Sequence, residues 1–126
     1  MLSITKKFEF DAAHHLPYHE GACNRCHGHR YVLECEIKGE IINSLGPELG
    51  MIMDFGNLKR IVNKEIISKV DHTDLNGMFL NPTAERMTES IACILCPLID
   101  TEERQLIRIR LWETPDSYAE WRRNDG

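Results

Sequence analysis

The chain has 126 residues, of which 42% are hydrophobic and 28% are charged. A chain of this length has enough apolar material for one hydrophobic core, so we expect a single domain over residues 1–126 and exclude a multidomain enzyme. The 20 acidic residues outnumber the 15 basic ones, and the formal net charge of -5 argues against a nucleic-acid-binding surface.

A strand with one buried face is predicted for residues 3–14. Its even-numbered positions form an apolar row that ends on a histidine: Ile4, Phe8, Phe10, Ala12 and His14. A period of two is the pattern of a strand that has one face in the core. His14 is therefore expected to point inward at the end of this strand.

A second strand of the same kind is predicted for residues 27–39. Charged residues fill its even-numbered face, and the odd-numbered face points inward. The inward row consists of His27, His29, Tyr31, Leu33, Cys35 and Ile37. His27 and His29 are thus expected to enter the same interior as Leu33.

The middle of the chain predicts a turn, a short strand and an amphipathic helix. Residues 41–50 have the Asn, Ser, Gly and Pro content of a connecting turn, and residues 50–55 are consistent with a short strand. Asp54 is the expected N-cap of a helix that runs to about residue 69. Its apolar residues recur at helical steps: Phe55, Leu58, Ile61, Val62, Ile66 and Val70. Residues 71–82 are expected to form a loop.

A second helix and a last strand are predicted in the C-terminal part. The helix should begin near Thr83, with Glu85 in its first turn, where a negative charge suits the helix dipole. Its expected buried stripe is Met87, Ile91, Leu95 and Leu98. In residues 105–113 a carboxylate closes an aliphatic row: Ile107, Ile109, Leu111 and Glu113. The order strand, strand, helix, helix, strand predicts an α+β fold with helices on one side of an antiparallel sheet.

Five of the 6 histidines lie within the first 29 residues, and three of them have inward strand positions. His14, His27 and His29 together would form a catalytic type of zinc site, in which three neutral imidazoles leave a fourth position open. The alternative is that each is a core histidine with an ordinary hydrogen-bond partner, which we would favour for any one of them alone.

The 5 cysteines are expected to be reduced, because we expect a soluble, cytoplasmic protein. No apolar run is long enough to span a bilayer, and residues 1–16 lack the order of a signal peptide. Cys23 and Cys26 form one C-x2-C pair, and Cys93 and Cys96 form another, so a four-cysteine structural zinc site is an alternative. The second pair lies in an apolar helical run, where this spacing is typical of core packing.

Four further side chains have the chemistry to act in a site. Cys23 lies in a polar loop beside Arg25, which favours a reactive thiol. In Asp71–His72, the carboxylate could orient the histidine as a general acid or base, although neighbours in sequence need not contact each other. Glu113, at the end of a buried row, needs a cation or a ligand with two parallel N–H donors, unless it lies at an exposed strand end.

Six collinear motifs resemble the 6-pyruvoyl-tetrahydropterin synthase family, most closely its bacterial 6-carboxytetrahydropterin synthase (QueD-type) branch. They are F-x-F-x-A-A-H (Phe8–His14), C-x3-H-G-H (Cys23–His29), G-M-x-x-D-F-x-x-L-K (Gly50–Lys59), D-H-x-x-L-N (Asp71–Asn76), N-P-T-x-E (Asn81–Glu85) and W-E-T (Trp112–Thr114). The resemblance runs from about residue 2 to residue 114. It implies a tunnelling fold, in which each subunit contributes a four-stranded antiparallel sheet and two helices to an oligomeric barrel of trimers stacked into hexamers.

The resemblance also implies roles for individual residues. The metal ligands would be His14, His27 and His29, with one Zn2+ per subunit. Cys23 would transfer protons and Cys26 would not be its equivalent.

Asp71 would orient His72 as the proton donor or acceptor, acting on the zinc site of a neighbouring subunit. Glu113 would anchor the pterin, and Thr83 and Glu85 would line the same pocket.

The implied reaction is a zinc-dependent lyase reaction of 7,8-dihydroneopterin triphosphate. It gives 6-carboxy-5,6,7,8-tetrahydropterin, acetaldehyde and triphosphate, on the route to queuosine and other 7-deazaguanine nucleosides. In the pyruvoyl branch the reaction stops after triphosphate elimination, and a third branch replaces the cysteine by glutamate, which Cys23 argues against. Many relatives have arginine where this chain has His15, and the triphosphate ligands stay open among Lys6, Lys7 and Arg25. A non-catalytic zinc module, closed by Cys23, Cys26 and histidines, is the alternative from another class.

Overall fold

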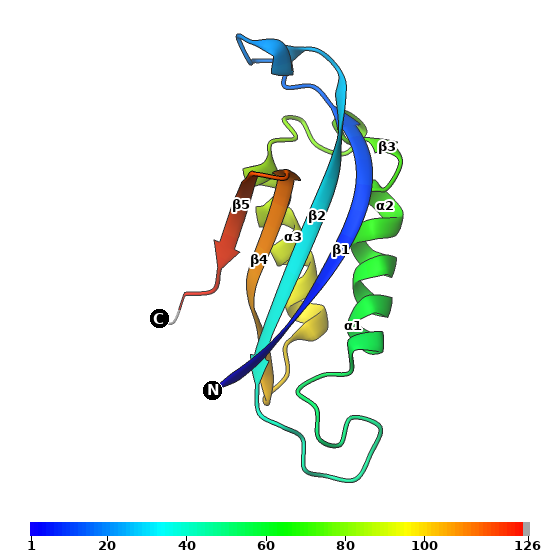
Figure 1. Ribbon diagram of the computed structural model, residues 1–126, viewed down its shortest axis with the longest axis vertical. Helices are drawn as coiled ribbons and strands as arrows, with labels where there is room; N and C mark the ends of the chain where they lie inside the picture. Colours follow the sequence, from blue (N-terminus) through cyan, green and yellow to red (C-terminus); the bar gives the residue numbers. More distant parts are fainter. Residues whose placement is uncertain (125–126) are drawn as a thin grey trace.

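One twisted sheet forms the centre of the protein, and helices cover one of its faces (Figure 1). The computed structural model describes residues 1–124. The sheet has five strands in the order β3-β1-β2-β4-β5. These are β1 (Leu2–His14), β2 (His27–Gly39), β3 (Thr73–Asp74), β4 (Arg104–Thr114) and β5 (Ser117–Arg122). The expected α+β class is confirmed, although the sheet contains one strand more than the four expected. The short strand β3 lies in a segment predicted as loop and runs parallel to β1.

The long β1–β2 ladder places the ends of both strands side by side. It is antiparallel and in register from Leu2 opposite Gly39 to His14 opposite His27. The predicted alternation is confirmed in both strands, because Phe8, Phe10, Ala12 and His14 are buried in β1, and Tyr31, Leu33, Cys35 and Ile37 are buried in β2.

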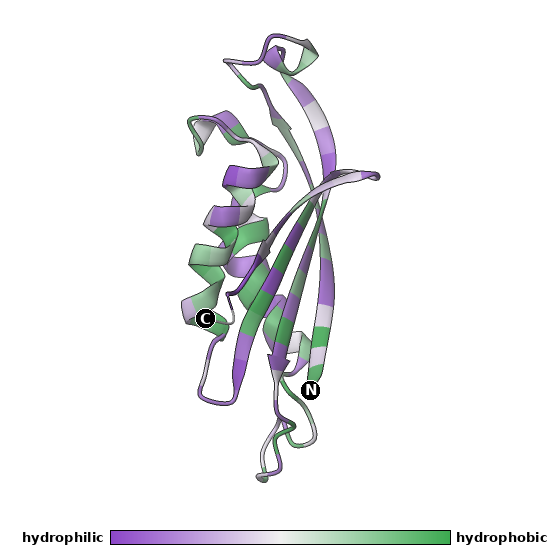
Figure 2. Cartoon of the chain, turned by 90° about the vertical axis from the view of Figure 1, so that its left-hand side faces the viewer, coloured by the Kyte–Doolittle hydropathy of each residue, from purple (hydrophilic) through white to green (hydrophobic). Residues whose placement is uncertain are grey.

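The two predicted helices lie on the same face of the sheet (Figure 2). The first is a continuous helical segment made of α1 (Phe55–Val62), a wider π-type turn η2 (Asn63–Ile67) and α2 (Ser68–Val70). The second is α3 (Ala84–Ile99). The predicted N-cap Asp54 is confirmed, since it accepts a hydrogen bond from the Asn57 N–H at 3.1 Å. The second helix begins where expected, and the structure shows that Thr83 caps it by accepting the Arg86 N–H at 3.2 Å. Two short 3-10 turns complete the fold, η1 (Ala22–Asn24) and η3 (Leu75–Gly77).

Three local predictions are wrong, each for a structural reason of its own. Residues 50–55 form no strand, because Gly50 and Met51 pair locally with Ile42 instead of joining the sheet. A β-bulge where β2 pairs with β4 moves Ile107 out of the core, and Leu106 is buried in its place. Leu98 is 44% exposed, since the buried stripe of α3 follows the twisted sheet and ends on Ile99.

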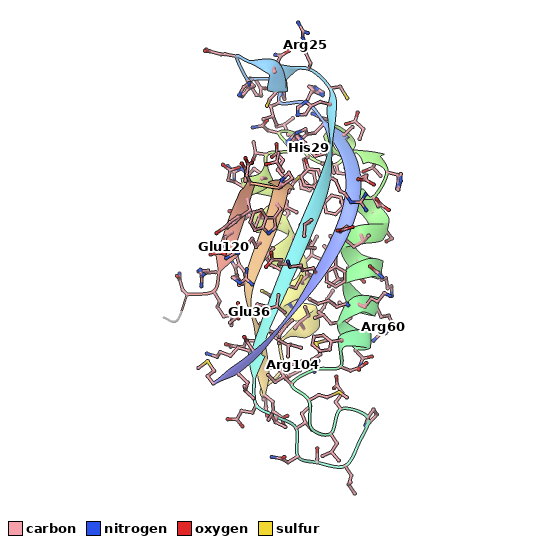
Figure 3. The ribbon with its side chains drawn as sticks, in the orientation of Figure 1. Arg25, His29, Glu36, Arg60, Arg104 and Glu120 are labelled. Atoms are coloured by element: carbon pink, nitrogen blue, oxygen red, sulfur yellow. The ribbon has the colours of Figure 1, made fainter. Side chains whose placement is uncertain are left out.

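The face of the sheet without helices carries charged side chains that are nevertheless largely buried. Arg108 is 9% exposed and pairs with Glu34 and Glu36 at 3.4 and 2.8 Å. The Trp112 indole N–H donates to Glu34 at 2.6 Å. Glu120 joins the same group from β5 (Figure 3). This face is therefore built from paired charges and not from apolar residues.

The helices of residues 1–124 include none with the length and apolar character needed to cross a membrane.

Candidate active site

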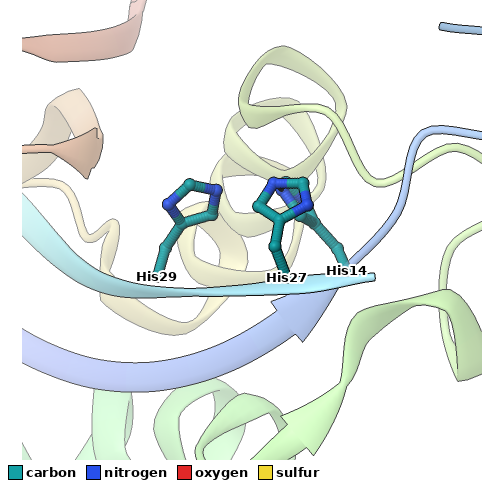
Figure 4. A group of neighbouring side chains, drawn as sticks. All are labelled: His14, His27 and His29. Atoms are coloured by element: carbon teal, nitrogen blue, oxygen red, sulfur yellow. Dashed lines mark hydrogen bonds between the residues drawn. The ribbon is translucent and has the colours of Figure 1, made fainter. Parts of the chain in front are cut away.

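Three histidines converge where the β1–β2 ladder ends (Figure 4). His14 is the last residue of β1, His27 is the first residue of β2 and lies opposite it, and His29 follows on the same face. Their ring centroids lie 4.6, 4.7 and 5.0 Å apart. His14 is fully buried and the other two are partly exposed. The structure thus brings together the three residues that the strand patterns directed inward.

Backbone carbonyls orient two of the imidazoles. The Nδ1 of His14 lies 3.0 Å from the Pro82 carbonyl oxygen, and the Nδ1 of His27 lies 2.6 Å from that of Arg25. A carbonyl only accepts, so each Nδ1 carries the proton and each Nε2 presents a lone pair. These two Nε2 atoms face each other at 3.1 Å. Two lone pairs at this distance repel, unless both coordinate one cation.

His29 supplies the third free nitrogen. Its Nε2 is buried and has no hydrogen bond among the described residues, although Glu113 Oε1 lies 3.2 Å away. Burial lowers the pKa of His29, against the opposing effect of the Glu113 charge, and so favours the neutral imidazole. Two ligands of a tetrahedral zinc stand about 3.3 Å apart, close to the separation of the His14 and His27 nitrogens. The three histidines therefore fit a divalent metal ion.

Glu113 places its carboxylate against this cluster. Its Oε1 lies 3.2 Å from His29 Nε2 and 3.8 Å from His14 Nε2, and its side chain is 24% exposed. The sequence left open whether Glu113 points inward or lies at an exposed strand end. The structure places its carboxylate inward, beside the histidines. The Tyr31 hydroxyl, 3.3 Å from His14 Nδ1, is a neighbour that the sequence did not single out. Burial raises the pKa of Tyr31 far above its usual range, so this phenol stays protonated.

A hollow of about 320 Å³ lies beside Glu113 at the start of α3. Its lining includes Glu85, Glu113, Ser117 and Tyr118. Glu85 and Glu113, which the resemblance assigns to one pocket, therefore share a cavity. Thr83 has another use in this chain, because its hydroxyl caps α3.

Asp71 and His72 form a hydrogen-bonded pair at the edge of the sheet. Asp71 Oδ1 accepts the Asp11 backbone N–H at 3.0 Å and lies 3.1 Å from His72 Nδ1. The Asp11 N–H, followed by the His72 contact, holds the pKa of Asp71 below its usual value. His72 has a left-handed backbone, with φ of 58°, and its side chain is 78% exposed. Within residues 1–124, no hydrogen bond or ion pair connects this dyad to the three histidines.

The cysteines are free thiols, and none belongs to the histidine cluster among the described residues. Cys23 is a half-buried free thiol in η1, and Cys26 is exposed. Cys93 is exposed on α3, against the expectation of core packing, because it faces away from the sheet, whereas Cys96 packs against the core. In the part of the chain that the structure describes, the metal-capable groups contain no cysteine, which leaves the four-cysteine site and the closed zinc module without support.

The site is a cluster of three histidines that could hold a metal ion, and a carboxylate lies beside it. The cluster lies at one end of an α+β sheet. A family model described as 6-pyruvoyl tetrahydropterin synthase matches residues 3–124. The chain belongs to this family.

Similar proteins agree with this assignment. The 6-carboxy-5,6,7,8-tetrahydropterin synthase of Haemophilus influenzae is 36% identical over 96% of this chain and 99% of its own. The protein of the same name from Synechocystis is 34% identical, over 96% and 93% of the two chains. The Caenorhabditis elegans 6-pyruvoyl tetrahydropterin synthase structure superposes with a TM-score of 0.80 at 23% identity, covering 98% of this chain and 96% of that one, which shows the fold. The prediction of an enzyme is confirmed.

Proposed function

We propose that this protein uses zinc to convert 7,8-dihydroneopterin triphosphate and water to 6-carboxy-5,6,7,8-tetrahydropterin, acetaldehyde and triphosphate. The observation that carries the proposal is the Glu113 carboxylate next to three histidines whose Nε2 atoms converge and could bind one metal ion. The carboxy branch is favoured because relatives of 36% and 34% identity have the corresponding name.

Substrate binding is assigned to the hollow at the start of α3. The 2-amino-pyrimidinone edge of a pterin presents two parallel N–H donors, which a carboxylate accepts in a paired arrangement. Glu113 and Glu85 both line the hollow. A pterin anchored there would direct its three-carbon side chain toward the histidines.

Side chains of the protein transfer protons to and from the three-carbon side chain of the pterin. Zinc, when bound by His14, His27 and His29, supplies Lewis-acid polarisation of the side-chain oxygens. Cys23 removes a proton as the thiolate and His72 returns one, so that the triphosphate can leave by elimination. Asp71 keeps the His72 Nδ1 engaged, which leaves its Nε2 for the proton transfer.

We further propose that the complete site forms between subunits of a homo-oligomer, a trimer or hexamer. The exposed His72, and the lack of a hydrogen bond or ion pair between the dyad and the histidines within residues 1–124, support this arrangement. The outer edge of β5 and most of the outer edge of β1 have no strand partner among the described residues, so both can pair with further copies. All five thiols are free, as expected for a cytoplasmic protein.

The test is to incubate the zinc-loaded protein with 7,8-dihydroneopterin triphosphate and identify the products by mass spectrometry. We expect 6-carboxytetrahydropterin and acetaldehyde in equal amounts. A product that retains all three side-chain carbons would move the protein to the pyruvoyl branch. Release of neither triphosphate nor acetaldehyde, from protein that contains zinc, would overturn the proposal. Light scattering of the same sample tests the oligomer, and a monomer that turns over substrate would contradict a site shared between subunits.

A further inference from the structure

Asn76 binds both main-chain groups of His15, the residue that directly follows His14. Its Oδ1 accepts the His15 N–H at 2.8 Å, and its Nδ2 donates to the His15 carbonyl oxygen at 2.9 Å. Because one partner can only donate and the other can only accept, the orientation of the amide is unambiguous. The contact spans 61 positions of the sequence.

This contact lies where the ladder around His14 ends. On one side of β1 the pairing with β2 stops at His14 opposite His27. On the other side β3 pairs only with Ala12 and Ala13. The Asn76 amide therefore continues the pairing by one residue, in the way a neighbouring strand would, and prevents the end of β1 from fraying beside His14.

The segment that carries Asn76 contacts β1 and His14 at several other points. The His72 N–H donates to the Asp11 carbonyl oxygen at 2.6 Å, and Asp71 accepts the Asp11 N–H. At the far end of the segment, the Pro82 carbonyl holds the His14 ring. The main chain and the imidazole of His14 are thus both oriented by residues 71–82, which also carry the Asp71–His72 dyad.

Asn76 is itself held in place before any ligand arrives. Its N–H donates to Asp74 Oδ1 at 3.0 Å, within the turn η3. Leu75 is fully buried and fixes this turn on the core. The main chain that carries the amide is therefore fixed next to His15.

We propose that Asn76 is a positioning residue for the metal: it fixes the end of β1 so that the His14 Nε2 converges with those of His27 and His29. This inference rests on the zinc site of the proposed function. It predicts an effect on the metal that does not depend on turnover.

The experiment measures zinc affinity by competition with a chromophoric chelator, and the visible absorption of the cobalt-substituted protein, which reports ligand geometry. We expect Asn76→Ala to weaken zinc binding by about 10- to 100-fold, the usual effect of removing a group that orients a ligand. The cobalt spectrum should change as well. Asn76→Asp, which keeps an acceptor for His15 N–H and loses the donor, should weaken binding in the same direction.

Leu75→Val is the matched control, because it removes one buried methylene next to Asn76 and keeps the amide with its two bonds to His15. It should lower the thermal midpoint without changing the zinc affinity or the cobalt spectrum. If Asn76→Ala folds poorly, Asn76→Asp decides the question. Zinc affinity and cobalt spectrum equal to wild type in a folded Asn76 variant would overturn this inference and leave the proposed function intact. Equal losses in the Leu75 and Asn76 variants would also overturn it, and a wild-type protein that binds no metal would overturn both proposals.

Discussion

Glu113→Gln is the substitution that tests substrate recognition most directly. Glutamine keeps the shape of the side chain but offers one acceptor oxygen and one NH2 group in place of two acceptors. One of the two expected N–H bonds from the pterin is therefore lost, and two donors face each other. A hydrogen bond to a charged group contributes about 1.5–3 kcal/mol, equivalent to a roughly 10- to 150-fold change in Kd. Because the side chain is 24% exposed, solvent screens part of this effect, and we expect about tenfold.

Calorimetric titration of the zinc-loaded protein with 6-carboxypterin, the oxidised form of the product, measures this effect. Zinc content must be measured in parallel, because Glu113 Oε1 lies only 3.2 Å from His29 Nε2. Glu89→Gln is the control, since it removes the same charge from the exposed side of α3, outside the hollow. A Kd for Glu113→Gln equal to that of Glu89→Gln, with zinc retained, would refute the assignment of Glu113 as the pterin anchor.

Three other substitutions test the remaining roles. His14→Ala should lose zinc, measured per subunit by atomic emission, whereas His15→Ala should retain it, because His15 has no place in the cluster; the reverse result would contradict the ligand assignment. Cys23→Ala should keep zinc and lower turnover by about two to four orders of magnitude, whereas Cys26→Ala should have little effect; equal zinc loss in both would instead indicate a structural cysteine site. Asp71→Asn should be less stable than wild type at neutral pH. Because folding lowers the pKa of Asp71 from its usual value of 3.8, its contribution is present above that value and is lost as pH falls through the folded pKa. Urea unfolding should therefore show a difference that disappears in acid, and a difference that persists there would refute the ionic origin.

Features with local signals could be predicted from the sequence. The period of two placed His14, His27 and His29 on inward faces, and Asp54 was identified as a cap, because the side-chain bond of this cap reaches only three residues along the chain. The resemblance to the family added the roles of residues that periodicity cannot assign, Cys23 above all.

Features that depend on a partner strand or a distant loop could not be predicted. The bulge that buries Leu106 in place of Ile107 depends on how β4 pairs with β2, and a single strand pattern contains no information on it. Asn76 contacts a residue 61 positions away, so nothing near it in the sequence indicates its role. The Pro82 carbonyl is a main-chain group, which any residue at that position would supply.

The left-handed backbone of His72, with φ of 58°, imposes a conflict between stability and chemistry. An L-residue in this conformation costs roughly 1 kcal/mol more than glycine, although histidine tolerates it better than most. Glycine would relieve the backbone and remove the imidazole, and a β-branched residue would clash with its own main chain. Stability of the fold and the proton transfer proposed for His72 therefore make opposite demands at this one position, and thermostabilising changes to this protein have to be sought elsewhere.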